Sequence, residues 1–374
     1  MKFPNRIISL FVFLVVSLSC NEAQVKTPPA KTSKTHGYVL EKVVDDVEIP
    51  WGMAFLPDGS ILYTEKRGDL ILFQDGSKTV IRDVPPAFAH GQGGLLDVIL
   101  HPNYKDNGWI YLSQSYAEDG QAGNTRIIRG KLDGDRLADQ QVLYQASPAT
   151  NRAHHFGSRM KFDRDGYLYF SIGDRGERDV NPQDVKRDNG KIYRIHDDGR
   201  IPEDNPFVGT PGAKAAIYSY GHRNPQGMDR HPATGEIWTH EHGPRGGDEI
   251  NIIRKGKNCG WPVISYGINY SGTKFTEITH KEGMEQPLHQ WTPSIAPSGM
   301  AFVNSDYYPD WKGSLMVGAL KFMYLQRVVL DGDKVVREEK LFEKSGRLRD
   351  VRQAPDGFLY ISVEQEGIFK IVKG

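Results

Sequence analysis

Two adjacent histidines and an aspartate are the residues of this sequence best suited to proton transfer. His154 and His155 stand just before a short apolar segment, and Asp174 follows a second one. The turn sequence Asp-Arg-Asp-Gly at residues 163–166 separates the two segments, so they are expected to pair as a hairpin whose outer ends meet. The hairpin would place an imidazole base beside a carboxylate, as general acid–base catalysis requires.

The alternative for these residues is a solvated histidine pair and a turn aspartate without any chemistry. Neighbouring residues of a strand point to opposite sides, so only one of His154 and His155 is expected to face a shared cavity. Whether a site exists depends on the elements that position these side chains.

The composition indicates a mostly β chain with a small-molecule partner. The 374 residues include 40 glycines and 22 prolines, and few segments show the i, i+3, i+4, i+7 apolar spacing of helices, which favours many short strands joined by turns. The 47 basic and 47 acidic residues balance, which argues against a nucleic-acid partner and against a strongly anionic one. A chain of this length can still be one closed β domain.

A weak repeat runs along the chain from residue 38. Each copy combines a small residue, alternating apolar positions, a Pro/Asp/Gly turn and a second strand with an aromatic residue. The copies cover residues 51–63, 96–111, 160–169, 227–238, 299–315 and 351–360. Six copies predict an all-β fold, a six-bladed β-propeller over residues 38–374. Residues 367–372 and 38–44 are expected to share one blade and close the ring, because an open propeller leaves exposed strand edges.

The N-terminus has the layout of a bacterial export signal. Two basic residues precede an apolar run at residues 7–18 that is too short for a comfortable membrane span. Residues 1–19 are interpreted as a lipoprotein signal peptide, because the sequence up to Cys20 resembles a lipobox, and residues 20–37 as a flexible tether. The protein is expected to be periplasmic and lipid-anchored to the outer membrane. With Cys20 lipidated, Cys259 would be the only thiol left, so no intramolecular disulfide is expected.

Polar residues stand in the segments just before five of the six repeats. These segments are residues 90–95, 154–155, 220–227, 291–299 and 346–350. Because propeller blades start near the central axis, the segments are expected to converge on one face. Arg223, Arg347 and Arg349 could hold a ligand rich in carboxylates, since a guanidinium pairs with a carboxylate through two hydrogen bonds. The alternative for any single segment is ordinary turn chemistry, and this is the interpretation preferred for His90 and Pro297.

A glycine-rich acidic loop at residues 241–251 is a candidate cation site. It lacks the spacing of ligand oxygens that an EF-hand has. Backbone carbonyls in so tight a turn could hold a hard cation together with water, nearby carboxylates or an anionic ligand. The alternative is a loop without a metal.

These motifs together resemble the soluble PQQ-dependent aldose sugar dehydrogenases, a family of six-bladed propellers. The motifs occur in the order seen in that family and are Pro50-Trp51-Gly52, residues 91–96, His154-His155 with Arg159, Ile172-Gly173-Asp174, residues 221–227, His242-Gly243-Pro244 with Gly247-Asp248-Glu249, Gly260-Trp261-Pro262, residues 296–299 and residues 347–350. The resemblance covers roughly residue 38 to the C-terminus. It implies an oxidoreductase that converts the anomeric hydroxyl of an aldose to a lactone, with pyrroloquinoline quinone (PQQ) held over a calcium ion and an external electron acceptor as partner.

The resemblance also implies roles for individual residues. His155 would be the general base, Asp174 would orient and stabilise it, and Arg223 would be the third catalytic residue. The residues implied to hold PQQ are Gln92, Arg223, Asn224, Tyr270, Ser294, Lys321, Arg347 and Arg349. His154 stands where the glucose dehydrogenase branch has an acidic residue, which argues against glucose specificity.

Two calcium sites are implied in the same way. Gly243 and Pro244 would offer backbone carbonyls to the catalytic calcium, and Glu249 and the backbone of Cys259 would hold a second, structural calcium. Cys259 stands where relatives often have an aromatic residue, so only a main-chain contact is expected there.

Two other functions fit the same fold. One is a calcium-dependent propeller lactonase or hydrolase, in which calcium polarises a carbonyl and a histidine activates water. The other is a lipid-anchored propeller that binds a partner without chemistry, since a fold does not fix a function. The positively charged side chains distinguish the dehydrogenase from these two alternatives. Lys321, Arg223, Arg347 and Arg349 around one pocket suit a tricarboxylate quinone, and a lactonase does not need them.

Overall fold

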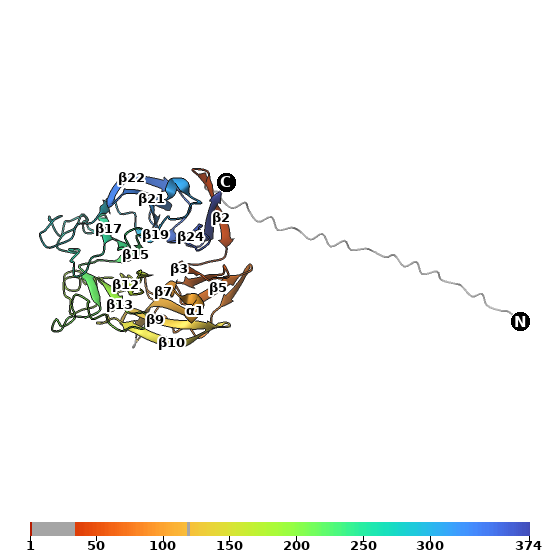
Figure 1. Cartoon of the computed structure of the whole chain (residues 1–374), viewed down its shortest axis with the longest axis horizontal. Coiled ribbons are helices and arrows are strands. Elements are labelled where there is room, and N and C mark those ends of the chain that lie inside the picture. Colours follow the sequence, from red (N-terminus) through yellow and green to blue (C-terminus); the bar gives the residue numbers. More distant parts are fainter. Residues whose placement is uncertain (2–33, 118–119) are drawn as a thin grey trace. The chain divides into compact units, whose positions relative to one another are not determined.

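The computed structural model describes residue 1, residues 34–117 and residues 120–374. From residue 34 onward, six antiparallel sheets surround a central axis (Figure 1). The six-bladed β-propeller is therefore confirmed. No helix in these residues is long and apolar enough to cross a membrane. Apart from residue 1, the predicted signal peptide lies outside the described residues, as does most of the predicted tether.

Five blades have four strands each, and the strands of one blade follow one another along the chain. Their bounds are Pro50–Phe55 (β3), Ile61–Glu65 (β4), Leu70–Gln74 (β5) and Ser77–Val80 (β6); Leu95–Leu100 (β7), Trp109–Ala117 (β8), Gly123–Asp133 (β9) and Arg136–Gln145 (β10); Met160–Phe162 (β11), Leu168–Ile172 (β12), Lys191–Ile195 (β13) and Ile217–Tyr220 (β14); Pro225–Arg230 (β15), Ile237–Glu241 (β16), Asp248–Ile252 (β17) and His289–Trp291 (β18); Pro297–Phe302 (β19), Leu315–Ala319 (β20), Tyr324–Asp331 (β21) and Lys334–Leu341 (β22). A helical turn at Tyr104–Asn107 (α1) precedes β8, and a 3-10 turn at Pro309–Trp311 (η1) precedes β20.

The sixth blade joins the two ends of the described chain. Its strands are Lys34–Thr35 (β1), Tyr38–Val44 (β2), Leu348–Gln353 (β23), Leu359–Val363 (β24) and Gly367–Lys373 (β25). β2 pairs with β25, so the predicted closure of the ring is confirmed. β1 lies inside residues 20–37, for which a flexible tether was predicted, and its pairing with β2 shows that residues 34–35 belong to the sheet.

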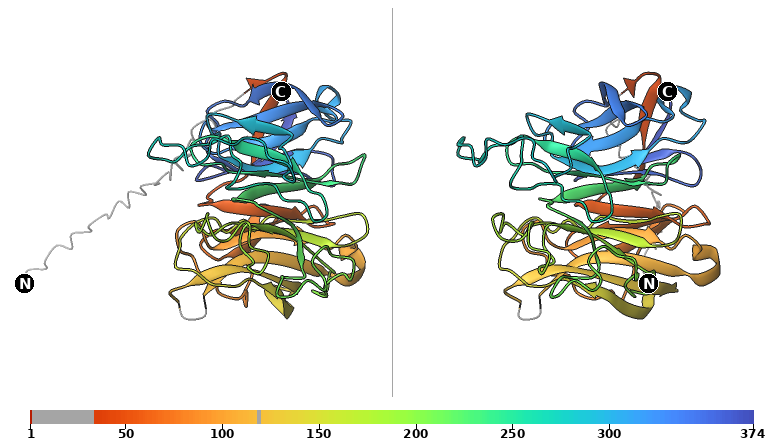
Figure 2. Two further views of the ribbon diagram at one scale, coloured as in Figure 1. Left: turned by 90° about the vertical axis from the view of Figure 1, so that its left-hand side faces the viewer. Right: turned by 60° about the vertical axis from the view of Figure 1, so that its left-hand side comes forward.

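Burial differs between the strands of a blade because each sheet packs between two neighbours (Figure 2). The second strands β4, β12, β16 and β24 are buried along their whole length, and the outermost strand β6 is exposed along its whole length. One apolar cluster joins Tyr111 and Ile127 of one blade to Phe170 and Tyr193 of the next. The hydrophobic core therefore lies between the blades.

Three aspartates join the inner strands of neighbouring blades near the axis. They stand in β7, β15 and β23, and each accepts a backbone N–H from the inner strand of the next blade. The bonds run from Met160 N to Asp97 Oδ2 at 2.9 Å, from Phe302 N to Asp229 Oδ2 at 2.8 Å and from Met53 N to Asp350 Oδ2 at 3.3 Å. Every inner strand therefore takes part in one such link.

Three cations compensate these carboxylates. Arg159 Nη1 lies 3.2 Å from Asp97 Oδ1 and 2.9 Å from Asp350 Oδ1. Arg352 pairs with the same two aspartates. Its Nη2 lies 2.6 Å from Asp97 Oδ1, and its Nε lies 2.9 Å from Asp350 Oδ2. The third cation is Lys161, whose Nζ lies 2.6 Å from Asp229 Oδ1. Because the side chains of Arg159, Asp97 and Asp350 are at most 2% exposed, the loss of one partner would leave a buried charge uncompensated.

Asp350→Ala should lower the free energy of unfolding by about 3–5 kcal/mol, because Arg159 and Arg352 would lose a buried partner. Equilibrium urea unfolding followed by tryptophan fluorescence measures this change. Asp135→Ala is the matched control, since it removes only an exposed partner of Arg82 and should leave the unfolding midpoint nearly unchanged. Equal midpoints for the two variants would contradict a structural role for the axial charges.

Candidate active site

A cavity of about 430 Å³ lies on the axis at the end where the inner strands begin. This axial cavity takes lining residues from all six blades, among them Trp51, Gln92, Gly157, Asn224, Ala296 and Arg349. Each of them stands within or just before the inner strand of its blade. The polar segments before the repeats thus converge on one face, as expected.

The hairpin of β11 and β12 places a base beside a carboxylate. The two strands pair around the predicted turn. Gly157 allows their outer ends to approach closely, because it has a φ of 63° and a Cβ there would lie 2.8 Å from Gly173 N. His155 Nδ1 lies 2.6 Å from Asp174 Oδ1. The predicted meeting of imidazole and carboxylate is therefore confirmed.

His155 is held in one tautomer as a neutral ring. Burial raises the pKa of Asp174, but the His155 ring and Arg223 outweigh burial and hold this pKa below its ordinary value. The ionised carboxylate only accepts hydrogen bonds, so His155 Nδ1 carries the proton and Nε2 keeps its lone pair. Burial lowers the pKa of His155 to about 4, although Asp174 opposes the decrease. At physiological pH, Nε2 can therefore accept a proton.

Trp261 and Gly176 fix the orientation of the Asp174 carboxylate. Trp261 Nε1 donates to Asp174 Oδ2 at 2.9 Å, and Gly176 N donates to Oδ1 at 2.8 Å. Asp174 is 1% exposed, and these bonds satisfy oxygens that water does not reach. Sequence analysis gave Trp261 no role, because it lies far from Asp174 along the chain.

His154 faces the same cavity as His155, so the prediction that only one of the pair would do so is wrong. Both histidines line a second cavity of about 450 Å³, and their ring centroids are 4.5 Å apart. The physical reason is that residues 154–155 lie in a loop before β11, where His155 has a left-handed φ of 59°. Strand alternation does not apply to such a backbone.

This second cavity, called here the histidine cavity, adjoins the axial cavity. Arg223 and Tyr270 line it together with the histidines, and the next residue along the chain, Asn224, lines the axial cavity. Gln92 Oε1 accepts a hydrogen bond from His155 N at 2.9 Å. Tyr270 is 73% exposed, so it stands at the open side. A molecule between the two cavities would contact both the base and the axial residues.

Arg223 and Asn224 brace the loops around the two cavities. Asn224 Oδ1 accepts a hydrogen bond from Gly157 N at 3.1 Å. Arg223 Nη1 donates to His242 O at 2.9 Å, and the guanidinium carbon lies 5.4 Å from the centroid of the Trp261 ring. Arg223 therefore links the loop after β16 to the residue that holds Asp174.

Arg347 and Arg349 lie in the axial cavity and share one carboxylate. Arg347 Nε lies 2.7 Å from Glu364 Oε2, and Arg349 Nε lies 2.9 Å from Glu364 Oε1. A third cation, Lys66, lines the same cavity and donates to Gly91 O at 2.8 Å. Burial lowers the pKa of Lys66, and the Arg349 charge lowers it further. One carboxylate against three cations leaves positive charge for an anionic ligand.

Sequence analysis missed Lys66 and Glu364, although a common signal marks them. Both directly follow the second strand of their blade, as His242 and Leu320 do, and all four line the axial cavity. The second strand runs toward this face, so the residue after it reaches the cavity rim. A search for polar residues directly after the second strand of each repeat would have found both.

Lys321 and Ser294 do not line either cavity. Lys321 is exposed, and its Nζ lies 5.1 Å from the centroid of the Phe322 ring. Ser294 Oγ accepts a hydrogen bond from Ala296 N at 3.2 Å. Both residues are close neighbours of residues that line the axial cavity, so they lie at its rim.

The carbonyl oxygens of Gly243 and Pro244 already accept hydrogen bonds. Arg223 Nη1 donates to Gly243 O at 3.2 Å, and Ile268 N donates to Pro244 O at 3.1 Å. The loop is held by Asp248, whose Oδ1 accepts from Gly243 N at 2.8 Å. A carbonyl oxygen has a second lone pair, so contact with a cation is compatible with these bonds.

Glu249 is half-buried and forms an acidic pair with the buried Glu241, beside Cys259. Burial and the Glu241 carboxylate raise the pKa of Glu249 to about 8. Asn251 Nδ2 donates to both carboxylates, at 3.2 Å and 3.3 Å. A cation would relieve this repulsion. In the described part of the chain, no three His, Cys, Asp or Glu side chains are grouped to hold a metal, so such a cation would also need backbone oxygens.

The fold and the site define a class of protein, a closed six-bladed propeller with a carboxylate-bonded histidine beside a cation-rich axial cavity. Residues 47–371 match the model of the glucose/sorbosone dehydrogenase family, and the chain belongs to this family of sugar dehydrogenases.

Proteins of this kind resemble the chain along nearly its whole length. The aldose sugar dehydrogenase YliI of Escherichia coli K12 is 42% identical over 362 residues, which cover 94% of this chain and 95% of the relative. The apo-form crystal structure of the soluble aldose sugar dehydrogenase from Escherichia coli superposes with a TM-score of 0.86 at 41% identity and covers 90% of this chain and 100% of that one. The PQQ-bound aldose sugar dehydrogenase of Streptomyces coelicolor has a TM-score of 0.74 at 29% identity, with 92% and 99% coverage.

His155 should change protonation near pH 4, with a neutral ring above that pH and a charged ring below it. Asp174→Asn removes the charge that raises the His155 pKa, so the midpoint should fall further. Nitrogen-15 NMR of the histidine side chains across a pH series measures both midpoints. A wild-type midpoint near the ordinary value for histidine, or a rise in Asp174→Asn, would contradict the electrostatics of this pair.

Proposed function

We propose that this protein oxidises the anomeric hydroxyl of an aldose to the lactone, with PQQ as the hydride acceptor. The observation that carries the proposal is a neutral His155, bonded to Asp174, at a cavity that adjoins the arginine pair of the axial cavity. A related protein named as an aldose sugar dehydrogenase and another solved in a PQQ-bound form support the substrate class and the cofactor.

His155 Nε2 would take the proton from the sugar hydroxyl. Asp174 would stabilise the resulting imidazolium, because its carboxylate already accepts the Nδ1–H. Arg223, in the wall of the same cavity, would orient the sugar oxygen and favour its developing negative charge. PQQ, when bound, supplies the quinone group that accepts the hydride. His154 in the same cavity argues against glucose as the preferred sugar.

The axial cavity fits a planar tricarboxylate. Trp51 and Phe156 give it flat apolar walls, and Lys66, Arg347 and Arg349 give it positive charge. Within the axial cavity PQQ would be held by Gln92, Asn224, Arg347, Arg349 and Lys66, with Ser294 and Lys321 at the rim. Arg223 and Tyr270 would contact PQQ from the histidine cavity. Glu364 would compete for the two arginines, and a ligand with three carboxylates offsets that competition.

Two calcium ions would complete the site. Gly243 and Pro244 would offer their carbonyl oxygens to a catalytic calcium, which prefers oxygen ligands. Glu249 and the backbone of Cys259 would hold a structural calcium, and the raised pKa of Glu249 beside Glu241 is the feature that such a cation would relieve.

A lactonase is a weaker alternative, because the arginine pair of the axial cavity serves no purpose for a substrate without a carboxylate. Electrons would pass from the reduced quinone to an external acceptor. The acceptor would approach at the open side of the histidine cavity or at the rim near the exposed Lys321.

Export and lipid anchoring of the protein remain part of the proposal. The mature chain should begin at Cys20 and carry more than one acyl chain, because one chain binds a membrane only marginally. Mass spectrometry of the N-terminal peptide measures this. An unmodified N-terminus beyond Cys20, with the protein free in the periplasm, would contradict the anchor.

Arg349→Ala should weaken PQQ binding by about 1.5–3 kcal/mol, because the variant loses a charged hydrogen bond. The test is to titrate the calcium-loaded apoprotein with PQQ and to follow tryptophan fluorescence or quinone absorbance retained after desalting. Chelation of calcium should abolish turnover of an aldose panel. Undiminished PQQ affinity in Arg349→Ala and Arg347→Ala would remove this pair from the site.

His155→Ala is the matched control that separates binding from chemistry. It should retain PQQ and calcium but lower kcat by roughly 10²- to 10⁴-fold, the usual contribution of a general base. His154→Ala should act mainly on sugar affinity. If stopped-flow reduction of bound PQQ by an aldose proceeds at the wild-type rate in His155→Ala, the assignment of the base is wrong.

A further inference from the structure

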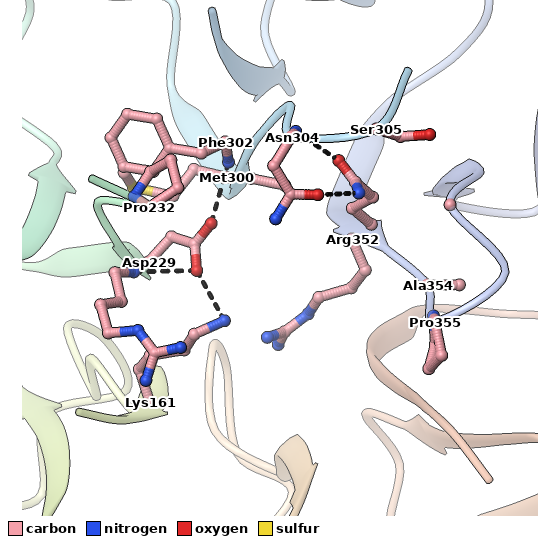
Figure 3. A pocket seen from close by; sticks show the side chains of 14 residues that line it. Lys161, Asp229, Pro232, Met300, Phe302, Asn304, Ser305, Arg352, Ala354 and Pro355 are labelled. Carbon is pink, nitrogen blue, oxygen red and sulfur yellow. Dashed lines mark hydrogen bonds and ion pairs between the residues drawn. The ribbon is translucent and has the colours of Figure 1, made fainter. Parts of the chain in front are cut away.

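A third cavity, of about 470 Å³, lies at the opposite end of the inner strands (Figure 3). This distal cavity is lined by Lys161 in the middle of the short strand β11, Asp229 near the end of β15, Phe302 at the end of β19 and Arg352 near the end of β23. The axial cavity takes residues from the beginnings of the same strands. The two cavities therefore have separate mouths, and none of the residues assigned to sugar oxidation lines the distal one.

The Asp229 carboxylate and the two side-chain amide oxygens at the distal cavity already accept hydrogen bonds. Asp229 Oδ1 accepts from Lys161 Nζ at 2.6 Å and from Arg230 N at 2.9 Å, and its Oδ2 accepts from Phe302 N at 2.8 Å. Two amide side chains bond to each other on the facing wall. There Asn304 N donates to Gln353 Oε1 at 2.8 Å, and Gln353 Nε2 donates to Asn304 Oδ1.

Three side chains at this cavity have unused hydrogen-bond donors. Arg352 uses Nε for Asp350 and Nη2 for Asp97, and no hydrogen bond joins its Nη1 to another described residue. The Asn304 amide is oriented by Gln353, which leaves Asn304 Nδ2 without a partner among the described residues. Figure 3 shows the Arg352 guanidinium and the Asn304 amide nitrogen turned toward the open space. Lys161 has three donor protons and one carboxylate partner.

The charge around the cavity matches one negative ligand charge. The three axial aspartates are balanced by Arg159, Lys161 and Arg352. Arg230 also lines the cavity and has no ion-pair partner in the described part of the chain. One positive charge therefore remains, at a site that presents several donors.

We propose that the distal cavity is a binding site for a small organic acid with a single carboxylate. The carboxylate would accept hydrogen bonds from Arg352 Nη1, Lys161 Nζ and Asn304 Nδ2, which come from three blades. Pro232, Met300, Phe302 and Pro355 line the cavity as apolar surface for a carbon skeleton, which favours an organic acid over inorganic phosphate. The ligand stabilises the propeller, because it binds only where these blades are assembled.

The test is isothermal titration calorimetry of the purified full-length protein with sodium lactate and, separately, sodium phosphate, both in chloride buffer. We expect one lactate per chain with a dissociation constant at or below about 1 mM, and weaker binding of phosphate. Asn304→Asp should weaken lactate binding at least about tenfold, since it replaces a donor with a charged acceptor. This variant keeps the oxygen that accepts from Gln353, so the local fold is preserved.

Gln365→Glu is the matched control, because it makes the same amide-to-carboxylate change at an exposed residue that does not line the distal cavity. It should bind lactate as the wild type does, and lactate should raise the melting temperature of both. Equal lactate affinity in Asn304→Asp and wild type would overturn the proposal, as would no binding of lactate at about 10 mM. Tighter binding of phosphate than of lactate would overturn the assignment of a carboxylate. None of these measurements needs PQQ or sugar turnover, so their outcome is independent of the proposed oxidation.

Discussion

The hydrogen bonds that three axial aspartates accept from backbone N–H groups of the next blade are the constraint on which the rest of this structure depends. Asp97, Asp229 and Asp350 each hold the inner strand of a neighbouring blade, so all six strands are tied at the axis. Burying each carboxylate costs desolvation free energy, and the ion pairs with Arg159, Lys161 and Arg352 offset this cost. Apolar packing between blades supplies most of the burial, but it is non-directional. The charged links are directional, and they define how far the inner strands approach the axis and hence where a cavity opens at each end.

The catalytic candidates depend on this frame through loops rather than through strands. His155 is set by a left-handed backbone before β11, and its partner Asp174 follows β12. Trp261, from another blade, orients the carboxylate. Burial keeps the imidazole neutral while the carboxylate keeps it in one tautomer, and these effects act on the pKa of His155 in opposite directions. A base with this combination is neutral at neutral pH and keeps a free lone pair, and the carboxylate stabilises the imidazolium that forms when a hydroxyl proton is transferred to it.

The two ends of the axis use charge differently. In the axial cavity, Lys66, Arg347 and Arg349 exceed the single carboxylate of Glu364, which suits a ligand with several negative charges. In the distal cavity the ionic pairs are nearly balanced, and the remaining groups are donors. Arg159 contacts two of the axial aspartates between these ends. The same ionic frame therefore separates two sites with different requirements for ligand charge.

The sequence by itself determined the all-β class, the six blades, the pairing of the first and last strands and the meeting of the histidine pair at residues 154–155 with Asp174. These features depend on repeat spacing and on turns between adjacent strands, which a local pattern records. Only the tertiary structure decided that His154 faces the same cavity as His155, because its direction depends on a left-handed loop residue and not on strand alternation. Trp261 likewise reaches Asp174 from another blade, and a contact between residues far apart along the chain leaves no periodic signal. Its position follows from closure of the ring, which brings the loops of all six blades to one axis.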